Sequence, residues 1–143
     1  MTALDQLVRL HRWTLDEKRQ KLAELERFRG KLQGNIDSLE ADLAREQAAA
    51  ERSELASLSL PNFIKATIDR RRKMEESIAE VDRSIAAARD EISEAFQEFK
   101  KYETAHGNHQ RREAQKQSRR EQTAADELGI DLHRRQAAGA AQG

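Results

Sequence analysis

The 143-residue sequence has no Cys, one Pro and six Gly, and its aromatic residues are one Trp, one Tyr and four Phe. Without Cys, the chain forms neither a disulfide scaffold nor a zinc site with thiolate ligands. A β-sheet protein needs more β-branched and aromatic residues and more turn-forming Gly and Pro. The sequence also lacks the run of roughly 20 apolar residues that a membrane-spanning helix requires. Once these classes are excluded, the composition indicates a helical protein.

Charge dominates the composition. Charged residues make up 36% of the chain and hydrophobic residues 37%, whereas ordinary domains have about 25% and 45–50%. Such a balance with little Gly or Pro is typical of coiled coils. The 26 basic residues equal the 26 acidic ones in number, so we expect no long-range attraction to nucleic acid or anionic lipid. The N-terminus lacks the features of a secretory signal, which predicts a cytosolic protein.

Apolar residues recur at heptad spacing from Leu4 to Ala50. Ten of the fourteen a and d positions in this stretch are apolar. A period of 3.5 residues predicts a helix over about 3–51 that packs along one seam. The seam residues are Leu15, Leu22, Leu25, Leu32, Ile36 and Leu39, and the polar exceptions are His11, Lys18, Arg29 and Glu46.

A second heptad pattern follows an interruption. Three Ser residues precede Pro61, which suits the first turn of a helix but not its interior. We therefore expect a turn over about 52–60 and a second helix over about 61–127. Ten of the twelve a and d positions from Ile64 to Tyr102 are nonpolar or aromatic. Its seam residues are Met74, Ile78, Val81, Ile85, Ile92 and Phe99.

The two seams align when the chain folds back on itself. Residues whose numbers sum to about 111 then face each other, such as Leu25 and Ile85. In that alignment the second seam ends at Asn108, level with the start of the first helix. The sequence thus predicts an all-α protein with one domain over 1–143. Its two long helices form an antiparallel coiled-coil hairpin rather than a parallel dimer.

A polar extension follows the predicted hairpin. Residues 109–120 hold five basic residues and one acidic residue, and they show no apolar face. A solvated helix, a surface for protein docking, and binding to nucleic acid or lipid head groups remain open as alternatives. Leu128, Ile130 and Leu132 form a small late cluster. A flexible tail is expected over about 133–143, with disorder from Ala137 to Gly143.

Residues suited to chemistry are few. The sequence lacks a Gly-rich phosphate loop, a nucleophile elbow and a metalloprotease motif. His106 and His109 have i,i+3 spacing but no third metal ligand. The basic run 70–73 is nearly cancelled by neighbouring acids, which favours a solvated, salt-bridged face. We therefore expect no catalytic residue, no metal and no cofactor, and the chain is not expected to be an enzyme.

Two groups of apolar residues lie off the predicted seam. Leu7, Leu10 and Trp13 fall on g, c and f positions, facing away from the partner helix. Large exposed apolar residues mark contact sites, and Trp is a preferred anchor. The group either docks a partner or is covered by the cluster at 128–132. Near the turn, Leu55, Leu58, Leu60 and Phe63 form a second group, which is either a loop plug or another contact.

Several stretches resemble one protein family. The opening 7–19, which reads LVRLHRWTLDEKR, the loop end 60–63 and the segment 64–73 look like the flagellar export protein FliJ family. The likeness extends through the second helix, with Phe96, Phe99 and Tyr102, into the polar tail. It covers nearly all of the chain.

The resemblance implies a soluble component of the flagellar type III export apparatus, peripheral at the cytoplasmic face of the inner membrane. It implies a coiled-coil stalk that docks on a FliI-like export ATPase hexamer, reaches a FlhA-like export gate and escorts export chaperones. No nucleic-acid partner is expected, and the membrane is reached only through protein partners. A generic coiled-coil adaptor, or a stalk of a non-flagellar secretion system, is the alternative.

The same likeness implies that one end of the hairpin enters the ATPase ring and the other meets the gate, and the residues at each end are the docking candidates. Those at the end expected to enter the ATPase ring are Leu7, Leu10, Arg12, Trp13 and Glu17. Those at the end expected to meet the gate are Leu43, Leu58, Phe63 and Ile64.

Overall fold

A computed structural model describes residues 2–142, which form two α-helices and no β-strand. Helix α1 spans Ala3–Ala50 and helix α2 spans Glu54–Gln142. The chain divides into two compact units, one of His11–Glu98 and the other of Met1–Leu10 with Phe99–Gly143. Both helices contribute to both units. The all-α architecture that the heptad patterns predict is confirmed.

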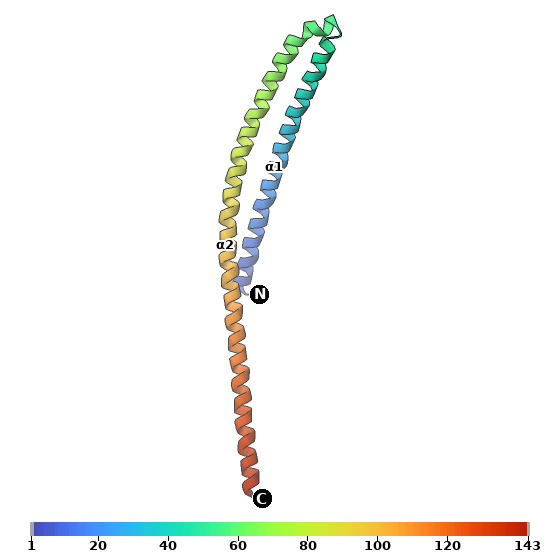
Figure 1. The fold of residues 1–143 in the computed structure, drawn as a ribbon. Coiled ribbons are helices and arrows are strands. Elements are labelled where there is room, and N and C mark those ends of the chain that lie inside the picture. The colour runs from blue at the N-terminus through green and yellow to red at the C-terminus, as the bar shows by residue number, and fades with distance from the viewer. Residues whose placement is uncertain (1, 143) are drawn as a thin grey trace. The chain divides into compact units, whose positions relative to one another are not determined.

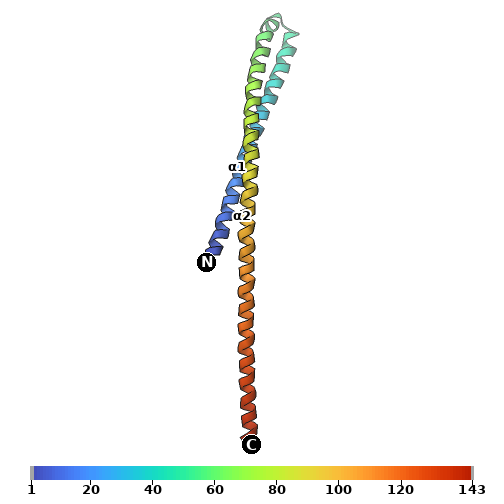
Figure 2. The same ribbon diagram turned by 90° about the vertical axis from the view of Figure 1, so that its left-hand side faces the viewer.

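The unit His11–Glu98 is an antiparallel hairpin, in which α1 and α2 lie side by side (Figure 1). Its buried residues all occupy predicted a or d positions: Leu15, Ile36, Thr67, Val81, Ile85 and Ala88. The other predicted seam residues of this unit are half-buried, namely Leu22, Leu25, Leu32, Leu39, Met74, Ile78 and Ile92. Phe99, in the other unit, is buried. The hairpin core is therefore a single line of side chains between the two helices. Figure 2 shows the ribbons of α1 and α2 from a second direction.

Ion pairs between the helices show how the hairpin is aligned. Arg29 contacts Asp82, and Glu40 contacts Arg71. The residue numbers in each pair sum to 111, which is the alignment that the two heptads predict. Folding back of the chain on itself is thereby confirmed.

The connection between the helices is shorter than predicted. It comprises residues 51–53, and α2 begins at Glu54, so the expected turn over 52–60 is wrong. The Ser53 hydroxyl accepts a hydrogen bond from the Ala56 amide at 3.4 Å, and its carbonyl accepts one from Ser57 at 3.0 Å. Ser53 thus acts as an N-cap, which satisfies amides that a helix start leaves unpaired.

Pro61 consequently lies inside α2 and not in its first turn. Proline has no amide hydrogen, so it removes one hydrogen bond to the carbonyl four residues earlier. The Ser59 hydroxyl donates to the Ala56 carbonyl at 3.1 Å in this segment. The seven residues before Pro61 remain helical.

The predicted disordered tail is also wrong for the described residues, because α2 continues to Gln142. Four Ala residues lie between 137 and 141, and Ala has the highest helix propensity. Arg135 also pairs with Asp131 one turn earlier, at 3.3 Å. Every residue from 110 to 141 is exposed, so the seam ends where the sequence predicts. Met1 and Gly143 lie outside the described residues.

Candidate interaction surfaces

Three basic residues occupy seam positions of the hairpin, and each has an acidic partner on the other helix. Lys18 Nζ lies 3.3 Å from Glu91 Oε2. Arg29 Nε lies 2.5 Å from Asp82 Oδ1, and Arg71 Nη1 lies 3.1 Å from Glu40 Oε1. The long aliphatic stems of Lys and Arg can cover apolar surface while their charged ends stay in water. The polar exceptions in the heptads are thus tolerated and orient the two helices.

Asp82 and Arg29 perturb each other's protonation. The hydrogen bond from Arg29 lowers the pKa of Asp82 below its usual value, and the nearby charges of Arg29 and Arg89 act in the same direction. The same hydrogen bond raises the pKa of Arg29. Both groups are therefore charged across the physiological pH range.

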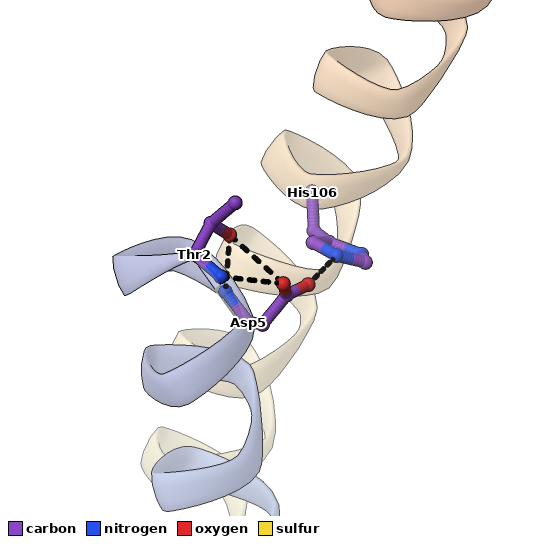
Figure 3. A network of polar contacts seen from close by, with 3 residues as sticks. All are labelled: Thr2, Asp5 and His106. Carbon is purple, nitrogen blue, oxygen red and sulfur yellow. Dashed lines mark hydrogen bonds and ion pairs between the residues drawn. The ribbon is translucent and has the colours of Figure 1, made fainter.

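In the unit of Met1–Leu10 and Phe99–Gly143, Asp5 joins the start of α1 to α2 (Figure 3). The Thr2 amide and hydroxyl both donate to Asp5 Oδ2 at 2.9 Å, and the Asp5 amide donates to the Thr2 hydroxyl at 3.2 Å. This reciprocal arrangement is a capping box, with Asp in place of the usual Glu. The other carboxylate oxygen, Oδ1, accepts a hydrogen bond from His106 Nε2.

These contacts favour the charged form of Asp5. The backbone hydrogen bond from Thr2 is the main cause, followed by those from the Thr2 hydroxyl and His106, and together they lower the pKa of Asp5 to about 2. A negative charge at a helix N-terminus is also stabilised by the helix dipole. Asp5 therefore both caps α1 and holds it to α2 within this unit.

Of the candidates for ring docking, Arg12, Trp13 and Glu17 belong to the hairpin unit and are exposed. Trp13 keeps 59% of its surface accessible. Leu7 and Leu10 belong to the other unit and are exposed as well. Leu128, Ile130 and Leu132 also remain exposed.

Near the connection the apolar residues divide into two groups. Leu55 and Leu58 are 79% and 78% exposed, the highest values among the exposed large hydrophobic residues. Leu43, Phe63 and Ile64, three of the candidates for gate docking, are half-buried. Leu58 is therefore the candidate whose side chain a partner could reach without disturbing the hairpin.

Sequence reasoning missed several features of these surfaces. Phe28 and Ile68 are 50% and 57% exposed, and they fall on g and e positions, which flank the seam. Residues at g and e positions are usually polar, so the apolar character of Phe28 and Ile68 was the sequence signal that could have indicated an exposed apolar surface. The Thr2 and Asp5 capping box was also missed, although the spacing of a hydroxyl and a carboxylate three residues apart indicates one.

Within residues 2–142, no three His, Cys, Asp or Glu side chains are placed to hold a metal ion. The surface depression beside Lys18 and Glu91 is open and lined mainly by charged and polar side chains. Neither helix, over its described residues, has the length and apolarity needed to cross a bilayer.

The hairpin unit is thus a two-helix antiparallel coiled coil with an ion-paired seam and exposed apolar residues, which places the chain among the coiled-coil proteins. The family model described as the flagellar FliJ protein matches residues 1–138. The chain therefore belongs to the flagellar FliJ family, and it is a non-catalytic component of the flagellar export apparatus. Comparison with curated proteins and with solved structures gave no match.

Proposed function

We propose that this chain is a coiled-coil stalk that docks on the ring of a FliI-like export ATPase hexamer and couples it to a FlhA-like export gate. Residues 1–143 act as a single domain in the cytoplasm at the inner membrane. The chain reaches the membrane through its protein partners, and it escorts export chaperones. Membership of the FliJ family supports a role in the flagellar export apparatus, and the exposed apolar residues support the docking roles.

The observation that carries ring docking is the exposure of Trp13. A Trp that is 59% accessible on a helix rich in charge exposes a large apolar area to water, and burying it against a partner is favourable. Trp is also among the residues most enriched in binding hot spots. Arg12 and Glu17 are exposed on the same helix and would supply polar contacts to the ATPase around the Trp13 side chain. Leu7 and Leu10 are the further candidates in the other unit.

The Trp13→Glu variant tests ring docking. If Trp13 is the anchor, the substitution removes a buried aromatic contact and weakens binding to the export ATPase by about 2–4 kcal/mol, which is roughly 30- to 1000-fold. Phe28→Glu is a matched control, because Phe28 is a half-exposed aromatic residue on the same helix. Binding is measured by titration of the ATPase, with circular dichroism to check folding. The assignment is contradicted if both variants weaken binding equally, or if neither variant weakens it.

Leu58 provides the corresponding test at the connection. Its side chain is 78% exposed, so Leu58→Glu should leave the hairpin folded. We expect this variant to lose binding to the cytoplasmic part of the export gate protein while it still binds the ATPase. Trp13→Glu should show the opposite pattern. Loss of both interactions in either variant would show that one surface serves both partners.

A further inference from the structure

Helix α2 carries two adjacent blocks of opposite charge. Residues 111–120 contain five basic residues and one acidic residue, and residues 121–131 contain four acidic residues and no basic one. The blocks therefore have net charges of +4 and −4 and are nearly equal in length. The basic members are Arg111, Arg112, Lys116, Arg119 and Arg120, and the acidic members of the second block are Glu121, Asp126, Glu127 and Asp131.

These blocks lie on a stretch of helix that packs against nothing in the single chain. Every residue from 110 to 141 is exposed; this is the orange to red part of α2 in Figure 1. Leu128, Ile130 and Leu132 are 61%, 55% and 49% exposed within it. Helices in proteins owe most of their stability to packing of one face, so this stretch would gain from a partner.

Few of the charges are neutralised within the stretch. Lys116 lies 3.6 Å from Glu113, and Arg135 lies 3.3 Å from Asp131. Both are local pairs between exposed side chains, which contribute little to stability. Most of the charge in each block therefore remains available to an approaching molecule.

We propose that this stretch pairs with the same stretch of a second copy of the chain, in antiparallel orientation about a twofold axis near Glu121. Twofold symmetry makes each contact occur twice with the roles of the copies exchanged. Residue 111 of one copy then lies level with residue 131 of the other, and the basic block of each faces the acidic block of its partner. Leu128 lies level with Ala114 of the second copy.

The charge order favours this partner over others. Parallel pairing in register would place like charges side by side, which is unfavourable. Nucleic acid or an anionic lipid surface would attract the first block and repel the second. A second copy presents the complementary order of charge over the same length of about 30 Å, given 1.5 Å per residue. A contact of this size is at the low end for stable interfaces, so we expect a reversible dimer.

Two charge variants test the pairing in the full-length chain. One replaces Arg111, Arg112, Arg119 and Arg120 with Glu, which changes the net charge of residues 111–131 from zero to −8. The other replaces Glu121, Asp126, Glu127 and Asp131 with Lys, which changes it to +8. Sedimentation equilibrium at low salt should show dimers of the unmodified chain, monomers of each variant alone, and dimers when the variants are mixed in equal amounts.

Salt provides a test without any substitution. Screening weakens contacts between exposed charges, so the dissociation constant of the unmodified dimer should rise at least about tenfold between 50 mM and 500 mM salt. Monomers of the unmodified chain at every concentration and salt level would overturn the proposal. Dimers of either variant alone would overturn it too.

A spin label at residue 139 tests the orientation. The chain has no Cys, and nothing lies within 4 Å of a Cβ added at Gly139, so Gly139→Cys introduces a unique attachment site without a clash. Antiparallel pairing about residue 121 separates the two labels by about 50 Å, given the helix rise. A separation under about 20 Å indicates parallel pairing and overturns the proposal. These experiments contain neither the export ATPase nor the export gate protein, so their outcome is independent of the proposed stalk function.

Discussion

Arg29 on α1 binds Asp82 on α2 through both ends of its guanidinium group, with Nε 2.5 Å from Oδ1 and Nη2 3.4 Å from Oδ2. Arg29 occupies an a position of the first heptad pattern, and the other a positions of this pattern are apolar. The contact with Asp82 therefore gives a charged residue of the seam an oppositely charged partner. Bidentate Arg–carboxylate contacts fix direction as well as distance. The pair therefore specifies which residues of the two helices stand opposite each other.

Exchanging the two charges should preserve the hairpin. Arg29→Asp alone places two carboxylates together, and Asp82→Arg alone places two guanidinium groups together, so each should lower the urea concentration at which the chain unfolds. The double exchange restores an ion pair and should recover most of the lost stability. Purely additive effects in this double-mutant cycle would show that the two residues do not interact in solution.

Acid should weaken the attachment of the start of α1. The pKa of Asp5 is lowered from 3.8 to about 2 by the hydrogen bonds from Thr2 and His106. Its contribution is therefore complete above about pH 4 and is lost as the pH falls toward 2, because protonation removes the charge that these groups favour. The protection of amides in the first turn of α1, which is the intrinsic exchange rate at each pH divided by the observed rate, should fall over this range. In Asp5→Asn the protection should already be low at neutral pH and should show no further loss between pH 4 and 2.

Truncating the seam should destabilise the hairpin in proportion to burial. Ile85 is 6% exposed, and replacement of a buried Ile by Ala costs about 2–5 kcal/mol. We expect Ile85→Ala to fall near the lower value, because a two-helix seam is open to solvent on both sides. Phe28→Ala, at a half-exposed position on the opposite helix, should cost less. Urea unfolding followed by circular dichroism measures both, and an inverted order would place Phe28 in the core.

Two glycines in α1 should be replaceable with a gain in stability. Gly30 and Gly34 lie inside the helix, and nothing lies within 4 Å of a Cβ added at either position. Ala in a helix interior is more favourable than Gly by about 0.5–1 kcal/mol. Gly30→Ala and Gly34→Ala should each raise the melting temperature. A decrease would mean that another molecule approaches this face closely in solution.

The fold followed from sequence because heptad spacing records packing directly. Leu15, Ile36, Val81 and Ile85 are buried, and each was placed on a seam by its spacing alone. The connection was predicted too long, because Ser and Pro are ambiguous: Ser53 caps α2 instead of interrupting it, and Pro61 removes only one hydrogen bond from a helix already formed. The tail was misjudged since an exposed helix has no apolar period to reveal it.

The interaction surfaces were less accessible to prediction. An apolar residue off the seam indicates exposure, as for Trp13, but the sequence of one chain carries no record of what would cover it. The contact between Asp5 and His106 joins residues about 100 positions apart whose numbers sum to 111. The predicted alignment of the helices therefore already placed the two residues level with each other, but neither residue type indicates that they form a hydrogen bond.

The three cross-helix ion pairs at the seam also distinguish the observed alignment from neighbouring ones. Sliding α2 by one heptad keeps apolar residues in contact, so the hydrophobic repeat alone resists it weakly. A slide in one direction places Arg29 beside Arg89 and Glu40 beside Ile78, and in the other direction it places Lys18 beside Ser84 and Glu40 beside Ile64. After either slide, only one of Lys18, Arg29 and Glu40 stands beside an oppositely charged residue. The ion pairs of the hairpin His11–Glu98 therefore favour the observed alignment of the two helices over either alignment one heptad away.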